Sequence, residues 1–97
     1  PISSVLHQFR AVLISDFNGG TIRVKAGELA GLRLENTDAA GHSFDVDELD
    51  VHVAMPGGST SAAVFSAATP GTYTFYCLPH YDKATGQGMH GTLIVER

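Results

Sequence analysis

The chain has 97 residues, enough for one domain with a single modest core. Its formal net charge is −4 and its six basic residues are scattered, which argues against nucleic acid or an anionic membrane surface as a partner. One cysteine excludes an internal disulfide, and no apolar run approaches the roughly 20 residues that a membrane-spanning helix requires.

Apolar and polar residues alternate in short segments, and no stretch has a convincing helical period. Signals rich in Gly, Pro and Asn separate these segments, for example a turn at 18–20 and another at 56–58. The predicted strands, in chain order, cover residues 4–14, 21–25, 29–36, 42–46, 51–55, 60–65, 72–77 and 91–96. Seven or eight short strands at this spacing predict an all-β fold, an antiparallel β-sandwich.

The alternation also predicts which side chains face the core. His42 shares its parity with Phe44, and Cys77 shares its parity with Phe75, so both the imidazole and the thiol should point inward. The other side chains predicted to face inward include Val5, Phe9, Ala11, Leu13, Ile22, Val24, Leu32, Leu34, Val46, Tyr73, Leu93 and Val95. Those predicted to face water include Ser43, Asp45 and Asp47.

Four side chains in this pattern are soft or borderline metal ligands. Cys77 and His80 form a Cys-x-x-His spacing, Met89 ends the following loop, and His42 lies far upstream. The 37–41 and 78–89 loops each follow a rising strand, so both can lie over the same pole of a sandwich. Two His and one Cys with a weak axial Met is the ligand set of blue-copper electron-transfer sites. These residues therefore predict a copper site.

Two neighbours of these ligands are suited to tuning the metal. Ser43 can join the two ligand loops by a hydrogen bond, and Pro79 has no N–H to donate to the Cys77 sulfur. Because the metal binds thiolate and not thiol, we expect the metal affinity to weaken as the pH is lowered.

Several segments resemble the small blue copper proteins, or cupredoxins, such as plastocyanin, pseudoazurin and amicyanin. The segments are TIRVKAGE at 21–28, ENTD through GHSF at 35–44, PGTYTFYC at 70–77 and GMHGTLIV at 88–95. The resemblance implies a Greek-key β-sandwich over residues 1–97 as a single domain, copper as the only cofactor, and one-electron transfer outside the cytoplasm. By position it implies His42, Cys77 and His80 as ligands, with Met89 axial. Eight residues separate His80 from Met89, more than is typical of plastocyanin-like members.

Other residues have plainer interpretations. His7, His52 and His90 are expected to be structural or exposed, with His90 as an alternative ligand. The acidic residues between 45 and 50 are expected to form a solvated face, with partner docking as the alternative. Zinc is disfavoured because a thioether is not among its usual ligands. The serines at 59, 61 and 66 lack a neighbouring base, so no enzymatic activity is expected.

The sequence thus favours a monomeric electron carrier of the periplasm or cell surface. Redox partner proteins would dock at the pole where His80 emerges, among Leu78, Pro79, Met55 and Pro56. Three alternatives remain: a domain of a larger copper enzyme such as a nitrite reductase or an oxidase, a copper storage or delivery protein, and a metal-free adhesion sandwich. A start at Pro1 fits a processed protein or a fragment.

Overall fold

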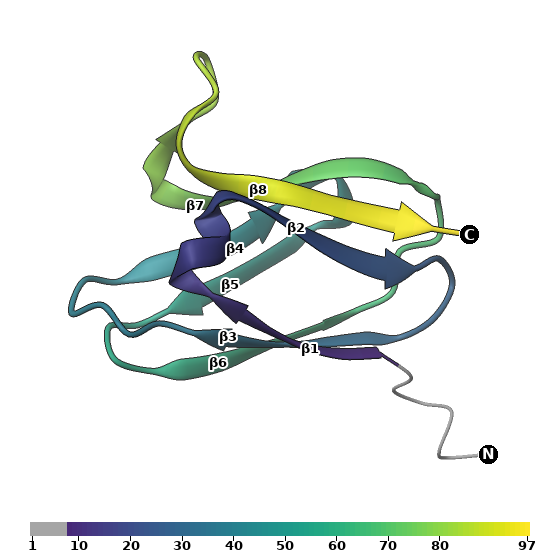
Figure 1. Ribbon diagram of the computed structural model, residues 1–97, viewed down its shortest axis with the longest axis horizontal. Helices are drawn as coiled ribbons and strands as arrows, with labels where there is room; N and C mark the ends of the chain where they lie inside the picture. The colour runs from purple at the N-terminus through teal and green to yellow at the C-terminus, as the bar shows by residue number, and fades with distance from the viewer. Residues whose placement is uncertain (1–7) are drawn as a thin grey trace.

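The computed structural model describes residues 8–97, and within them eight strands form two sheets (Figure 1). The strands are β1 (Gln8–Leu13), β2 (Asn18–Lys25), β3 (Ala30–Glu35), β4 (His42–Val46), β5 (Val51–Met55), β6 (Thr60–Phe65), β7 (Gly71–Asp82) and β8 (Gln87–Glu96). Two 3-10 turns accompany them, η2 (Ile14–Phe17) and η3 (Asp47–Leu49). One sheet has the order β1-β3-β6 and the other β2-β8-β7-β4-β5. The predicted β-sandwich is confirmed.

Two of the strand pairings are parallel. β1 pairs with β3 and β2 pairs with β8 in parallel, whereas the pairings within the rest of both sheets are antiparallel. The chain leaves the small sheet after β1, turns through η2 and enters the large sheet as β2. The sandwich is therefore mixed and not purely antiparallel.

The first strand has the opposite parity to the prediction. Phe9 is 63% exposed and Leu13 45% exposed, whereas Val12 is fully buried. Apart from Arg10, residues 9–14 are apolar on both parities, so alternation alone does not decide which face is inward. The prediction for Val5 lies outside the described residues. The turn predicted at 18–20 is also wrong, because η2 turns the chain and β2 already begins at Asn18 with a register shift before Thr21.

Three aromatic rings fill the centre of the core beneath the large sheet. Phe17 meets Phe75 edge-on at 5.1 Å between ring centroids, and Phe44 stacks on Phe75 at 5.3 Å. All three are at most 2% exposed, and the fully buried Cys77 belongs to the same cluster. The inward parity predicted for the strands after β1 is thus confirmed at Phe44, Phe75, Cys77, Ile22, Val24, Leu32, Leu34, Val46, Leu93 and Val95.

The segment predicted as a loop over 78–89 is a β-hairpin that projects beyond the sheet (Figure 1). β7 continues to Asp82, β8 starts at Gln87, and these two residues face each other at the hairpin end. The ladder is irregular between Tyr76 and Tyr81, the stretch that carries Cys77 and His80. Gly88 has a φ of 112°, and a Cβ there would collide with the His80 carbonyl oxygen. A glycine is therefore required beside the His80 backbone.

Side chains at the base of this hairpin fix it to the large sheet. The Tyr81 ring packs on Tyr76 at 5.2 Å between centroids, and the Lys83 ammonium pairs with Asp47 at 2.7 Å. Tyr76 is 5% exposed, and its hydroxyl donates to Asp47 Oδ1 at 2.6 Å. Hydrogen bonds from Lys83 and Tyr76 lower the pKa of Asp47.

Because the Tyr76 hydroxyl has this partner, we expect Tyr76→Phe to lower the free energy of unfolding by about 1 kcal/mol. Urea denaturation of the metal-free wild type and variant measures this difference in the free energy of unfolding. Tyr73→Phe is the control, since the Tyr73 hydroxyl donates to the Thr69 carbonyl at the exposed surface and its loss should cost less. Equal stabilities of wild type and Tyr76→Phe would show that this hydrogen bond does not hold the hairpin base.

Candidate metal centre

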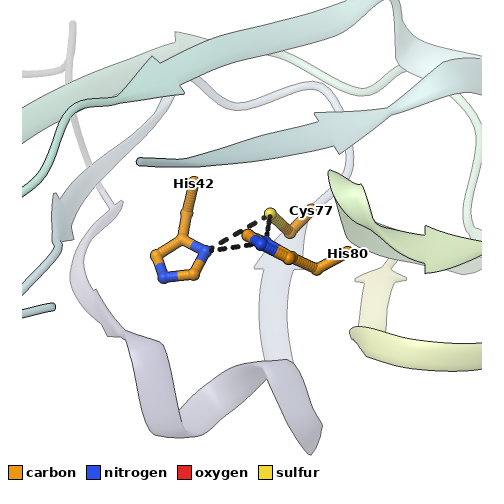
Figure 2. Close-up of side chains that lie close together, drawn as sticks. All are labelled: His42, Cys77 and His80. Atoms are coloured by element: carbon orange, nitrogen blue, oxygen red, sulfur yellow. Dashed lines mark hydrogen bonds between the residues drawn. The ribbon is translucent and has the colours of Figure 1, made fainter. Parts of the chain in front are cut away.

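Three of the four predicted ligands converge at one end of the sandwich (Figure 2). His42 opens β4, and Cys77 and His80 lie in the irregular part of β7, the neighbouring strand. The Cys77 sulfur lies 3.5 Å from His42 Nδ1 and 3.3 Å from His80 Nδ1. The two nitrogens are 3.1 Å apart. Within the described residues this is the group of His, Cys and acidic side chains able to hold a metal ion.

The size of this triangle fits a first-row metal ion. A regular triangle with sides near these distances has its centre about 1.9 Å from each corner, close to metal–nitrogen and metal–sulfur bonds of about 2.0 and 2.3 Å known for zinc. One thiol and two imidazoles are soft and borderline donors, a set suited to copper. The three residues therefore fit the predicted ion in both geometry and chemistry.

The three donors differ in exposure. The Cys77 side chain is fully buried and that of His42 is 5% exposed, whereas His80 is exposed. Leu78, next to Cys77, is 60% exposed. The centre therefore lies just beneath the surface, with the His80 imidazole on its solvent side.

Met89 and His90 flank the hairpin on β8. Met89 is half-buried and packs against the core cluster. His90 Nδ1 contacts the Gly88 carbonyl at 2.9 Å and its ring packs on Tyr81. Met55, predicted on the surface around His80, is fully buried. It lies on β5 opposite His42 of β4, and its side chain faces inward. His7 lies outside the described residues.

Ser43 joins the two ligand-bearing segments, as predicted. The Leu78 amide donates to Ser43 Oγ at 2.9 Å, and the Ser43 hydroxyl in turn donates to Asp45 Oδ2. Asp45 Oδ1 lies 2.7 Å from His52 Nδ1. A chain of hydrogen bonds thus runs from the surface at His52 to the backbone beside Cys77.

The prediction that Asp45 faces water is wrong. Its side chain is 6% exposed, because β4 lies between two strands and its outward side chain is flanked by His52 on β5 and Tyr76 on β7. Asp47 also has internal partners, Lys83 and Tyr76. Of the expected acidic face, Glu48 and Asp50 are exposed, and Asp50 Oδ1 lies 3.5 Å from His52 Nε2.

The Asp45–His52 contact predicts a pH-dependent stability. The hydrogen bond to Asp45, aided by the charges of Asp45, Asp50 and Asp47, raises the pKa of His52 above its usual 6.5. The stabilisation that this contact gives the folded state is fully present below the unfolded-state pKa of His52, and it is lost as pH rises through the folded-state pKa. We expect His52→Gln to lower the melting temperature more at about pH 5 than at about pH 9. A deficit that is the same at both pH values would contradict this assignment.

Comparison with known proteins places these observations in a family. A family model described as a cupredoxin-like domain matches residues 11–95. Auracyanin from the photosynthetic bacterium Roseiflexus castenholzii is 18% identical with a TM-score of 0.71, over 93% of this chain and 98% of that one. None of the helical segments within residues 8–97 is long and apolar enough to span a membrane.

Larger proteins contain similar domains. The periplasmic domain of subunit II of cytochrome oxidase from Bradyrhizobium japonicum is 18% identical with a TM-score of 0.64, over 78% of this chain and 54% of that one. A copper-containing nitrite reductase from Thermus scotoductus is 19% identical with a TM-score of 0.68, over 91% of this chain and 28% of that one. This chain thus spans about half the length of the cytochrome oxidase domain and about a quarter of the length of the nitrite reductase. At such identities the likeness concerns the fold.

The family match and the geometry of the three donors together assign the cofactor. A cupredoxin-like domain covers nearly the whole chain, and His42, Cys77 and His80 are positioned for a single ion. The cofactor is one copper ion.

Proposed function

We propose, given that this chain belongs to the cupredoxin family, that it carries single electrons between redox partners through a type 1 copper centre. The observation that carries the proposal is the convergence of His42 Nδ1, Cys77 Sγ and His80 Nδ1 within 3.1–3.5 Å of one another. Copper, when bound, supplies a one-electron couple between Cu(II) and Cu(I).

The protein's own contribution is to hold these donors in one arrangement for both oxidation states. His42 and Cys77 lie on adjacent strands, and the Leu78–Ser43 hydrogen bond ties the segments together. The fully buried thiol and the nearly buried His42 ring have little room to move. A fixed ligand set keeps the structural rearrangement during electron exchange small, which favours fast transfer.

We assign His42, Cys77 and His80 as ligands and Met89 as the weak axial ligand. Met89→Leu, which keeps the apolar volume but removes the sulfur, is expected to shift both the visible spectrum and the reduction potential. Met55→Leu is the matched control, because Met55 is buried and lies outside the proposed ligand set. A Met89→Leu protein with the spectrum and potential of wild type would remove the axial assignment.

Exposure of His80 favours it as the site where electrons enter and leave. Its ring lies on the solvent side of the centre, and Leu78, Pro79 and Pro56 are exposed as well. This surface suits the docking of a redox partner protein. We propose that the carrier is monomeric and extracytoplasmic, that residues 1–97 form one domain, and that the domain has no enzymatic activity of its own.

Electron carriage is tested by the rate of one-electron exchange. Stopped-flow mixing of the copper-loaded protein with a small reductant, followed by reoxidation, should show complete, reversible bleaching of the visible band within the dead time or shortly after it. A copper storage protein would instead release Cu(I) to a chelator faster than it exchanges electrons.

A second candidate is an electron-transfer domain of a larger copper enzyme. The observation that favours it is that similar domains make up only 54% and 28% of the cytochrome oxidase fragment and the nitrite reductase. Size-exclusion chromatography of the full-length native product separates the two candidates, since a free carrier elutes at the size of a single small domain.

A further inference from the structure

His42 has a second contact on the side of its ring that faces away from Cys77. Its Nε2 atom lies 2.9 Å from Asp38 Oδ2, while its Nδ1 atom faces the Cys77 sulfur and His80. Asp38 is not a candidate ligand, because it contacts Nε2 of the His42 ring, whereas Nδ1 faces the other two donors. We propose that Asp38 is a positioning residue that fixes the tautomer of His42 and tunes the copper centre through it; this rests on the proposed function.

The loop that carries Asp38 is built to present this carboxylate. Asn36, 2% exposed, donates from its side chain to the backbone carbonyls of Ala40 at 2.9 Å and Met55 at 2.8 Å. Its side-chain oxygen accepts from the Asp38 amide at 2.9 Å. The Asp38 carbonyl accepts from the Gly58 amide at 2.9 Å. Both backbone groups of Asp38 are therefore held, one by a buried side chain and one by the neighbouring turn.

The chemistry of this contact has a defined direction. An ionised carboxylate only accepts hydrogen bonds, so the proton of the neutral imidazole must be on Nε2. Nδ1 then carries the lone pair, and it points toward Cys77 and His80, the direction that a metal ligand requires. A carboxylate behind a ligating histidine also makes that ligand more basic. Both effects stabilise bound metal, and the negative charge favours Cu(II) over Cu(I).

Two substitutions separate hydrogen bonding from charge. Asp38→Asn keeps the size of the side chain and an oxygen that accepts from Nε2, but removes the charge; Asp38→Ala removes both. Loss of such a partner typically lowers metal affinity by about 10–100-fold. We expect Cu(II) affinity to fall more than Cu(I) affinity, and each tenfold difference raises the reduction potential by about 59 mV.

The control is Asp50→Asn, which makes the same change in net charge at a side chain that is 98% exposed and pairs with His52 instead of the site. Cu(II) and Cu(I) affinities are measured by chelator competition, and the potential by redox titration. Nitrogen-15 NMR of the metal-free protein reports the His42 tautomer independently of copper. We expect protonated Nε2 in wild type and Asp38→Asn, and a mixture of tautomers in Asp38→Ala.

The proposal is overturned if both Asp38 variants match Asp50→Asn in potential and affinities, or if His42 in Asp38→Ala keeps the wild-type tautomer. These results are distinct from a failure of the proposed function, which would appear as wild-type protein that forms no thiolate–copper band. In that case the NMR comparison still decides whether Asp38 sets the His42 tautomer.

Discussion

Replacement of Cys77 by Ser is expected to abolish the intense visible absorption of the copper-loaded protein. The colour of a blue-copper site depends on the copper–thiolate bond, and a serine oxygen does not provide it. Soft thiolate ligands also select Cu(I). Loss of the thiolate should therefore lower Cu(I) affinity by more than the roughly 10–100-fold that removal of an outer partner costs.

The measurement is a visible spectrum and a Cu(I) competition titration on both proteins. Unfolding of the metal-free proteins is the control. Serine has the same number of side-chain heavy atoms as cysteine, and ring nitrogens of His42 and His80 lie near enough to pair with the introduced hydroxyl. A Cys77→Ser protein that keeps the intense band would show that the sulfur is not a ligand.

Replacement of Phe75 by Ala is expected to be the most destabilising single change in the core. Phe75 is fully buried and contacts both other rings of the aromatic cluster. Phe→Ala substitutions at such sites cost about 3–5 kcal/mol, because they remove apolar contacts and leave a cavity. Urea denaturation of the metal-free protein measures the effect without the stability that bound metal adds.

The control for this prediction is Phe9→Ala. Phe9 is 63% exposed on β1, so the same chemical change there should alter the free energy of unfolding by no more than about 0.5 kcal/mol. Equal losses in the two variants would contradict the inward parity of Val12 on β1 and would place Phe9 in the core.

Alternation predicted the strands well wherever one parity is apolar and the other polar. β2 is the clearest case, because Ile22 and Val24 alternate with Arg23 and Lys25. The first strand lacks this contrast, and its inward face was therefore predicted wrongly. Which of its faces is buried depends on packing against the rest of the sandwich, and the sequence of this one segment holds no information about that packing.

The hairpin over 78–89 was not foreseen, for a different reason. It projects beyond the sheet, so apart from Met89 its residues do not face the core, and they show no apolar alternation that would reveal the strands. What holds its base is a set of contacts between distant residues, namely Tyr76 with Tyr81 and Asp47 with Lys83. Spacing between His80 and Met89 indicated its length but not its conformation.

The three side chains that converge, His42, Cys77 and His80, were predicted from the sequence because their spacing and strand parity match the ligand pattern of blue-copper sites. Their supporting partners were not. Asp38 has the sequence context of an ordinary loop residue, and the only signal is Asn36 two residues earlier, a spacing typical of an Asx turn. Burial of Asp45 follows from the position of β4 between β5 and β7, which only the sheet order shows.

Visible absorption during titration of the metal-free wild-type protein with Cu(II) tests the assignment of a type 1 copper centre most directly. We expect an intense blue or green band that grows linearly and stops at one copper per chain, because one thiolate and two imidazoles converge on a single site. A solution that stays colourless past one equivalent would contradict the copper centre, and with it the proposal of electron transfer.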